Sequence, residues 1–418
     1  MKDQIKHFTF FVIPVWLLAA FTLSLAQYPD SLIQALASQT NLDTLVYYVN
    51  VLSGEDSVTI NGSRYLITSR NASQPGNDLA ADFIYQTLEK TGLNTYDQNY
   101  SASGRNVFAI QTGTDYPDQQ FIICAHYDDM PGAVAPGADD NASGTAAVLE
   151  AARILSQVQI PYTVIYALWD EEEIGLVGSG YYAQQAFLAG DNILGVVNLE
   201  MFGWDGNDDG KFEIHTRPIA GSVNLANLIV QLENIYQISL TPLVQNPGTT
   251  ASDHSSFWNR GYTAIVYSQA FFSGDGNPYY HTSNDRIIYF NLGYFYSMSK
   301  LAVSTISHLA LNNMVVGIAD REDLVASGFR LEQNYPNPFN PTTTIPYKLP
   351  RSSQVNLSIY NSLGQEVRTL VNTIQAAGEH QIIWDGRDNH GQPVPSGVYI
   401  YRLQGENFSD SRKMMLIR

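Results

Sequence analysis

Five short apolar runs, rich in β-branched residues, constrain the fold of this chain more than any other feature of its sequence. They cover residues 107–110, 121–125, 162–169, 194–199 and 264–267. Apolar runs of this length are typical of strands that are buried on both faces of a sheet. Residues 78–90, 146–158 and 292–311 show the apolar spacing of helices. Strands that alternate with helices predict an α/β fold with a mainly parallel mixed sheet flanked by helices.

The C-terminal part of the chain has a different character. A proline- and asparagine-rich segment from Asn334 to Thr342 cannot be helical and introduces short alternating runs at 344–349, 355–360, 381–384 and 398–403. Turn residues separate these runs at the spacing of an immunoglobulin-like β-sandwich. A chain of 418 residues is also longer than a single hydrophobic core usually accommodates. We therefore expect an α/β domain over residues 27–315, a linker over 316–333 and an all-β sandwich over 334–418.

The first residues resemble a secretory signal peptide. Lys2 and Lys6 precede an apolar stretch over residues 8–23, and Ser24-Leu25-Ala26 supplies small residues for cleavage. We predict a signal peptide over residues 1–26, with no stable membrane span after its cleavage; the alternative is a retained anchor. Export permits disulfides, but Cys124 is the single cysteine and is expected to pack in a strand.

The net charge excludes one class of partner. The chain carries 22 Lys and Arg against 40 Asp and Glu, which gives a formal charge of −18. A surface with this charge repels phosphate backbones, so we expect no nucleic-acid partner.

Ionisable side chains follow the predicted strands at their carboxyl ends. His126 and Asp128 follow the second run, Asp170 to Glu173 the third, Glu200 the fourth, and His281 lies after the fifth. Asp139 and Asp140 precede the helix predicted at 146–158. Carboxyl ends of parallel strands share one edge of the sheet, where ligands bind. So many carboxylates repel one another unless cations neutralise them, and mixed histidine and carboxylate ligands indicate zinc, or else manganese or cobalt, rather than calcium.

Four motifs resemble those of the M28 metallopeptidases, which include bacterial leucyl aminopeptidases with two zinc ions. The motifs are His126-Tyr-Asp128, Ala135-Pro-Gly-Ala-Asp-Asp-Asn-Ala-Ser-Gly144, Glu172-Glu173-Ile-Gly-Leu-Val-Gly-Ser179 and His281-Thr282. The resemblance spans about residues 27–311. It implies a zinc-dependent exopeptidase, an aminopeptidase acting on peptides, in which a glutamate is the general base. Together with the predicted signal peptide, this leads us to expect a secreted enzyme.

The resemblance also implies roles for individual residues. Asp140 would bridge two metal ions, His126 and Glu200 would complete one site, and Glu173 and His281 the other. Glu172 would be the general base, and Asp128 would hold the second ring nitrogen of His126. Asp139 and Asp285 are expected in supporting positions. Glu200 departs from the aspartate usual in these aminopeptidases, which leaves occupancy by one or two metals open.

Other readings of the same motifs stay open. A glutaminyl cyclase or a carboxypeptidase of the same family would use nearly the same residues, and a surface-displayed binding module would keep only the scaffold. Asp253 and His254 lie in a Ser-Asp-His-Ser segment that resembles the substrate pocket of the family; a serine triad is the alternative, but the chain has no nucleophile elbow here.

A second metal is suggested further along the chain. Asp205, Asn207 and Asp209 alternate as in the first half of a calcium loop, with Gly210 at the sixth position. The glutamate expected at the twelfth position is replaced by Thr216, and Glu213 is the substitute we consider. A calcium site and a polar hairpin turn are both consistent with this pattern.

The tail resembles a C-terminal sorting domain of the type IX secretion system, an immunoglobulin-like module similar to the flagellar hook-capping fold. The resemblance rests on the segment that begins at Asn334, on Trp384-Asp-Gly-Arg-Asp388, on Ser396-Gly-Val-Tyr399 and on the basic ending at Arg418. It implies secretion machinery as a partner and a secreted or cell-surface location reached through the periplasm. A plain adhesive or spacer sandwich is the alternative.

Overall fold

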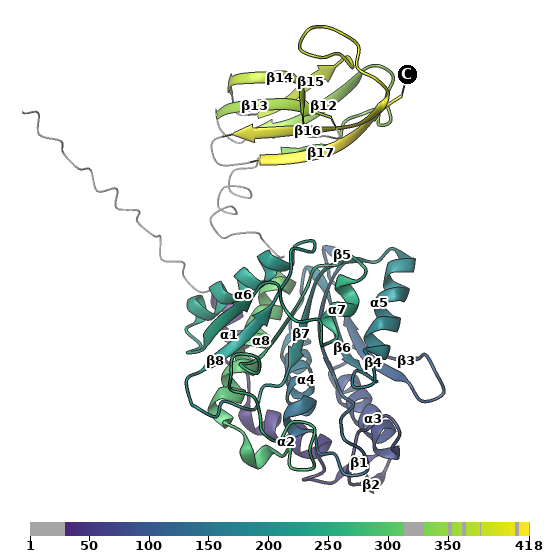
Figure 1. Cartoon of the computed structure of the whole chain (residues 1–418), viewed down its shortest axis with the longest axis vertical. Helices are drawn as coiled ribbons and strands as arrows, with labels where there is room; N and C mark the ends of the chain where they lie inside the picture. The colour runs from purple at the N-terminus through teal and green to yellow at the C-terminus, as the bar shows by residue number, and fades with distance from the viewer. Residues whose placement is uncertain are drawn as a thin grey trace, which may run out of the picture.

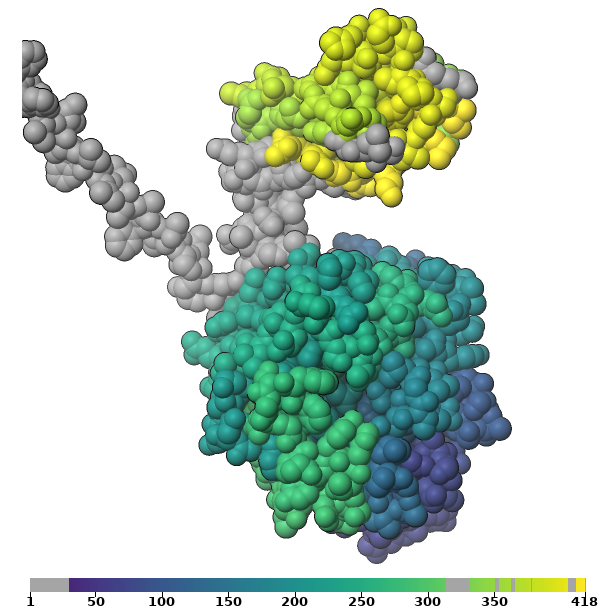
Figure 2. Space-filling view, viewed as in Figure 1, coloured from purple at the N-terminus to yellow at the C-terminus, as the bar shows by residue number. Residues whose placement is uncertain are grey.

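The computed structural model describes residues 30–312, 330–349, 353–361, 365–376, 378–405 and 409–417. They form two folded regions (Figure 1), whose buried apolar clusters share no residue. The surface of the first region is built jointly from its N-terminal segment, purple to blue, and its central segments, teal to green (Figure 2). The predicted signal peptide lies outside the described residues. Among those described, no helix has the length and apolar character needed to cross a membrane.

The first region is organised around an eight-stranded mixed sheet. In spatial order its strands are β3 (Asn94–Asn99), β4 (Arg105–Gln111), β6 (Tyr162–Trp169), β5 (Tyr116–His126), β7 (Asn192–Glu200), β10 (Ala264–Gln269), β8 (Lys211–His215) and β9 (Thr241–Gln245). The central strands β6, β5, β7 and β10 run parallel, whereas β4 and β8 pair antiparallel with their central neighbours. The predicted fold class is confirmed.

Helices cover both faces of this sheet. They are α1 (Ser31–Ala37), α2 (Leu42–Leu52), α3 (Pro75–Glu89), α4 (Gly144–Leu155), α5 (Val177–Ala189), α6 (Ser222–Tyr236), α7 (His254–Trp258) and α8 (Leu292–Asn312). Two short irregular helices, Ala138–Ser143 and Ile287–Tyr289, and a hairpin of β1 (Val58–Ile60) and β2 (Ser63–Tyr65) complete the region.

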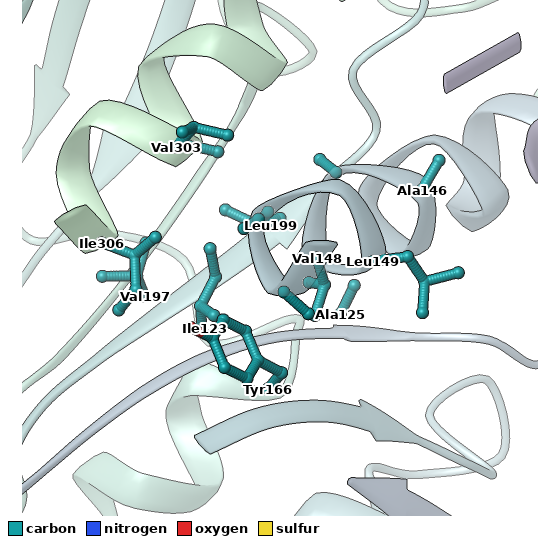
Figure 3. Packing of buried hydrophobic residues seen from close by; sticks show 14 of the residues in the cluster. Ile123, Ala125, Ala146, Val148, Leu149, Tyr166, Val197, Leu199, Val303 and Ile306 are labelled. Carbon is teal, nitrogen blue, oxygen red and sulfur yellow. The ribbon is translucent and has the colours of Figure 1, made fainter. Parts of the chain in front are cut away.

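The central strands are apolar throughout because successive side chains enter opposite cores. On β5, Ile123 and Ala125 join the core under α4 and α8, which Figure 3 shows, whereas Ile122 and Cys124 join the core under α5 and α7. Successive strand residues point to opposite faces, so a strand covered on both sides needs an apolar residue at every position. Cys124 is buried and free, as expected from its place in the strand.

The second region is a sandwich of antiparallel strands. One sheet contains β11 (Arg330–Leu331), β12 (Thr343–Leu349) and β15 (Gly378–Trp384), and the other contains β14 (Glu366–Gln375), β13 (Ser353–Tyr360), β16 (Gly397–Gly405) and β17 (Ser409–Leu416). Leu331, which we expected in the linker, pairs with Tyr347 and is buried. The sandwich therefore begins before residue 334, because Leu331 of its first strand already contributes to its core.

Candidate metal centre

The strand order brings the predicted metal-binding residues to one edge of the sheet. His126 is the last residue of β5, Glu200 is the last residue of β7, and Glu172 and Glu173 follow closely after β6. The parallel pairing aligns His126 with Trp169 of β6 and Cys124 with Asn198 of β7. The carboxyl ends of these three strands therefore lie side by side, as the sequence predicted.

Asp140 lies at the middle of this cluster. Its Oδ1 is 3.3 Å from Nε2 of His126, and its Oδ2 is 3.1 Å from Nε2 of His281. Asp285 fixes the segment that carries it, because an Asp285 carboxylate oxygen accepts hydrogen bonds from the main-chain N–H groups of Asp139 (3.1 Å) and Asp140 (2.9 Å). Each carboxylate oxygen of Asp140 thus faces a different imidazole, the arrangement expected of a bridging ligand.

One glutamate accompanies each imidazole. Glu200 places Oε1 at 3.1 Å from Nε2 of His126, and Glu173 places Oε2 at 3.0 Å from Nε2 of His281. The longer side chain of Glu200 therefore still reaches the cluster. Its other oxygen accepts a 2.6 Å hydrogen bond from the hydroxyl of Ser252, which in turn accepts one from the Asn198 amide at 2.7 Å. The result is two adjoining triads that share Asp140.

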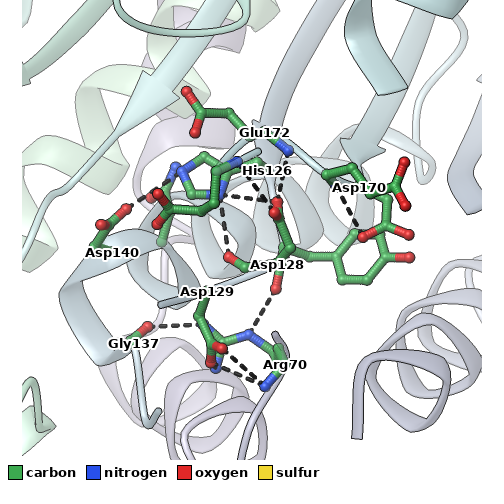
Figure 4. A network of polar contacts seen from close by, with 12 residues as sticks. Arg70, His126, Asp128, Asp129, Gly137, Asp140, Asp170 and Glu172 are labelled. Atoms are coloured by element: carbon green, nitrogen blue, oxygen red, sulfur yellow. Dashed lines mark hydrogen bonds and ion pairs between the residues drawn. The ribbon is translucent and has the colours of Figure 1, made fainter. Parts of the chain in front are cut away.

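Glu172 and Asp128 lie beside these triads (Figure 4). Ligand atoms of Glu172, His126 and Glu200 all lie within 4.8 Å of one another. The carboxylate of Asp128 accepts hydrogen bonds from the main-chain N–H groups of Glu172 (3.0 Å) and Glu173 (3.1 Å). Nδ1 of His126 is closer to the main-chain oxygen of Asp128, at 3.1 Å, than to its carboxylate, at 3.4 Å. Asp128 therefore fixes the two glutamates as well as the imidazole, which is broader than the role we expected.

The electrostatics of the cluster are those of an excess of buried carboxylates. Burial raises the pKa of Glu172 well above its usual value, and burial with the charge of Asp140 raises the pKa of Glu173 to about 8. Burial lowers the pKa of His281, but its contacts with Asp140 and Glu173 outweigh this and raise that pKa to about 10. Among the described residues, no Lys or Arg pairs with these carboxylates. The donor set therefore fits a divalent cation, and its mixture of imidazoles and carboxylates suits zinc.

The residues expected in supporting positions or in the substrate pocket are buried, among them Asp139, Asp253 and His254. Asp139 accepts hydrogen bonds from the Gly203 N–H (2.7 Å) and the Asn277 amide (2.8 Å). Asp253 is fully buried, neither of its carboxylate oxygens has a hydrogen-bond partner among the described residues, and burial raises its pKa to about 7. Burial lowers the pKa of His254 to about 3, with one ring nitrogen committed to the Thr249 carbonyl at 3.0 Å. An imidazole with so low a pKa is a poor proton acceptor, which argues against His254 as the base of a serine triad.

Two further residues beside the cluster were not found from the sequence. The ring of Tyr280 stacks on His281, with ring centroids 3.7 Å apart. Burial and nearby carboxylates raise its pKa well above the usual value, so its hydroxyl stays a donor. Asn198 could have been found, because it lies two residues before Glu200 on one strand and so faces the same side. Tyr280 had no comparable signal beyond its position next to a histidine.

The predicted calcium loop needs a correction at one position. Glu213 lies on β8 and accepts hydrogen bonds from the Phe272 N–H at 3.1 Å and from the Ser273 hydroxyl. Its carboxylate is therefore committed away from the loop. The side-chain oxygens of Asp205 and Asn207 accept the Asp209 N–H at 3.2 and 3.1 Å, which is the hydrogen bonding of a polar turn. A calcium ion bound by Asp205, Asn207 and Asp209 stays a prediction.

Comparison with protein families and curated proteins agrees with both folded regions. Residues 106–306 match the model of peptidase family M28, and residues 340–408 match that of the FlgD Ig-like domain. A probable zinc metalloprotease of Pyrenophora teres f. teres is 30% identical over 207 residues, which are 44% of this chain and 42% of that protein. Leucine aminopeptidase 1 of Trichophyton rubrum is 28% identical over 246 residues, or 54% of this chain and 65% of that protein. This chain thus spans less than two thirds of the length of either relative.

Solved structures agree with the fold of the first region. The LapA aminopeptidase of Legionella pneumophila superposes with a TM-score of 0.59 at 23% identity, covering 68% of this chain and 78% of that one. The glutaminyl cyclase of Bacteroides thetaiotaomicron superposes with a TM-score of 0.52 at 17% identity, covering 64% of this chain and 98% of that one. At these identities the similarity establishes the fold, and the comparisons as a whole support an M28-type zinc peptidase region followed by an immunoglobulin-like domain.

Proposed function

We propose that this chain is a secreted, zinc-dependent exopeptidase that removes N-terminal residues from peptides. The observation that carries the proposal is Asp140, whose two oxygens each face a different imidazole at 3.3 and 3.1 Å. This arrangement supports two zinc ions. His126, Asp140 and Glu200 would hold one ion, and His281, Asp140 and Glu173 would hold the other. When bound, such ions lower the pKa of a coordinated water and polarise the scissile carbonyl.

Glu172 is the proton carrier in this proposal. Its main-chain N–H is fixed by Asp128, and its side chain lies among the ligand atoms of His126 and Glu200. Burial raises the pKa of Glu172, which makes it a stronger base than an ordinary carboxylate. Glu172 would take a proton from the attacking water and deliver it to the amine of the departing peptide. The Tyr280 hydroxyl, beside His281, could donate a hydrogen bond to the oxygen that gains charge.

Aminopeptidase action is supported by charge as well as by relatives. Residues 30–312 contain ten Lys and Arg against 29 Asp and Glu. Two zinc ions would offset the carboxylates of Asp140, Glu172, Glu173 and Glu200, and the remaining acidic excess still favours a substrate that carries a free ammonium group. Access is from the His281 side, where that side chain is 32% exposed. The leucine aminopeptidase among the relatives supports the same direction of cleavage.

The direct test is hydrolysis of aminoacyl nitroanilides by the mature chain, with and without a chelator, combined with elemental analysis. We expect two zinc ions per chain, loss of hydrolysis after chelation and recovery when zinc is returned. Hydrolysis by protein that elemental analysis shows to carry no metal would contradict the proposal.

A glutaminyl cyclase is the second candidate, because such enzymes are among the similar solved structures. Mass spectrometry separates the two reactions, since hydrolysis adds water whereas cyclisation of an N-terminal glutamine releases ammonia. Peptides with a blocked N-terminus test for a carboxypeptidase, which would still cleave them. A binding module without activity would leave every peptide intact while retaining affinity for it.

We extend the proposal to the C-terminal domain as a secretion signal that directs export to the outside of the cell. Its match to an immunoglobulin-like model and its separate core support a self-contained module. Removal of residues 330–418 should leave hydrolysis unchanged and retain the enzyme in the periplasm. Unchanged export of the shortened chain would instead favour a spacer role for this domain.

The calcium site proposed at Asp205, Asn207 and Asp209 has its own test. A rise in the melting temperature on titration with calcium would support the site, and an unchanged melting temperature would contradict it.

A further inference from the structure

Among the described residues one arginine is buried, and it lies beside the metal cluster. Arg70 lies between β2 and α3, upstream of the segment that matches the peptidase model, and its side chain is 0% exposed. Burying a guanidinium away from water is costly unless its donors and its charge are satisfied. A buried arginine therefore has partners that the surrounding structure must supply.

Those partners are main-chain carbonyls of the two loops that carry metal ligands. Nε donates to the Tyr127 oxygen at 2.7 Å, Nη1 to the Pro136 oxygen at 2.8 Å and Nη2 to the Gly137 oxygen at 2.8 Å. Tyr127 directly follows the ligand His126, and Gly137 lies three residues before the ligand Asp140. Nη1 also donates to the Leu52 oxygen at 2.6 Å, at the end of α2. One planar group thus spans both loops (Figure 4).

The carboxylate of Asp129 contacts both the guanidinium and the main chain of Arg70. Its Oδ2 is 3.4 Å from Nη1 of Arg70, and both of its carboxylate oxygens accept the main-chain N–H of Arg70 at 3.0 Å. Asp129 directly follows Asp128, which holds the main-chain N–H groups of Glu172 and Glu173. The segment from Tyr127 to Asp129, which directly follows His126, is therefore anchored to Arg70 at both of its ends.

Gly137 shows how closely the second loop approaches the guanidinium. A Cβ at this position would lie 2.7 Å from Nη2 of Arg70 and 2.5 Å from the main-chain oxygen of Asp140. Its φ of +49° also lies in the left-handed region that favours glycine. The loop that delivers Asp140 can therefore take this path only with a glycine against Arg70.

We propose that Arg70 is a positioning residue of the metal centre, which holds His126 and Asp140 at the separation that lets them share one cation. The proposal rests on the metal assignment made under the proposed function. It also makes the segment 30–105, which precedes the residues that match the peptidase model, a part of the site. The same segment buries Leu45, Val49 and Ile67 in the main core.

The chain offers a matched arginine that ties the N-terminal helices to the rest of the fold without touching the ligand loops. Arg153 of α4 pairs with buried Glu150 at 2.7 Å and donates to the Gln39 oxygen at 2.8 Å. Glu150 in turn accepts the Asn41 N–H at 2.8 Å. Replacing Arg153 should therefore weaken the fold and leave the metal ligands in place.

The experiment compares Arg70→Lys, Arg70→Met and Arg153→Met in the mature chain. Lysine keeps the charge but cannot reproduce the planar fork, whereas methionine keeps only the aliphatic volume. The zinc dissociation constant is measured by chelator competition on protein shown to be folded by circular dichroism, alongside the melting temperature of the chelated protein. We expect zinc to bind at least tenfold more weakly to Arg70→Met and with intermediate affinity to Arg70→Lys. Arg153→Met should keep the affinity of the unaltered chain at a lowered melting temperature.

Kinetics at saturating zinc provide a second readout. The Arg70 variants should lose kcat with KM within about twofold, because the reacting geometry changes while the substrate contacts remain. Unaltered zinc affinity in folded Arg70→Lys and Arg70→Met would overturn this inference alone. Equal weakening in Arg153→Met would also overturn it, because the effect would then follow stability. An unaltered chain that binds no zinc would overturn the proposed function together with this inference.

Discussion

The two folded regions of this chain differ in what they bury. Residues 30–312 contain ten Lys and Arg against 29 Asp and Glu, whereas residues 330–418 contain nine against seven. Among the described residues, every buried charged side chain belongs to the first region, and the sandwich buries only Asn334, Thr343 and Ser358 beside its apolar core. A buried charge is costly unless it is paired or holds a cation, and Asp128, Asp139, Asp140, Asp253 and Asp285 of the first region are buried around the metal cluster. The contrast therefore assigns chemistry to the first region and leaves the second to be held together by apolar packing.

The largest expected effect is a loss of turnover when the proposed general base of the first region is removed. Glu172→Gln keeps the size and hydrogen-bonding capacity of the side chain but cannot accept a proton. General-base catalysis contributes roughly 10²- to 10⁴-fold, so kcat should fall by about that factor. Zinc content and the melting temperatures of both regions should stay the same, as elemental analysis and calorimetry would establish. Near-normal turnover in this variant would sink the assignment of the base.

The second effect is confined to the sandwich. Trp384 is fully buried and packs against Phe339 and Tyr399, with ring centroids 5.6 and 5.2 Å apart. Trp384→Ala should cost about 3–5 kcal/mol of the unfolding free energy of this region, because a large cavity replaces the ring. Calorimetry should show a lower melting temperature for the sandwich and an unchanged one for the first region, and the variant should still hydrolyse its substrate. A parallel loss of hydrolysis would mean that the two regions do not act independently.

The sequence predicted the parts of each region that local patterns encode. The strands β5, β6 and β7 were found because burial on both faces makes every position apolar. β3 was not, because its polar run Asn94–Asn99 is largely exposed and shows no apolar periodicity. The metal ligands were found because they follow strands that share one edge. Arg70 was not, because its role depends on carbonyls of Tyr127 and Gly137 that only the folded chain brings together.

A third test measures the protons that zinc binding releases from the metal cluster of the first region. Contacts with Asp140 and Glu173 outweigh burial and raise the pKa of His281 to about 10, so the imidazole is protonated at neutral pH in the protein chain alone. Only the neutral imidazole can bind a metal ion, so zinc binding should release protons. The zinc affinity should therefore rise by up to about tenfold per pH unit for each proton released. Calorimetry in buffers of different ionisation enthalpy would measure the release. Zinc affinity that is constant between pH 6 and 8 would contradict these ligand roles.

The smallest effect tests the charge of the first region as a whole. Its formal charge of −19 should attract the ammonium group of a substrate, and more strongly a peptide that also carries lysine. Salt shortens the Debye length from about 10 Å at 0.1 M to about 3 Å at 1 M, so KM for the lysine peptide should rise about twofold or more over that range. A matched peptide with glutamate in place of lysine should show a constant or falling KM. If both peptides respond to salt alike, the excess acid of this region serves the bound metal and not the capture of substrate.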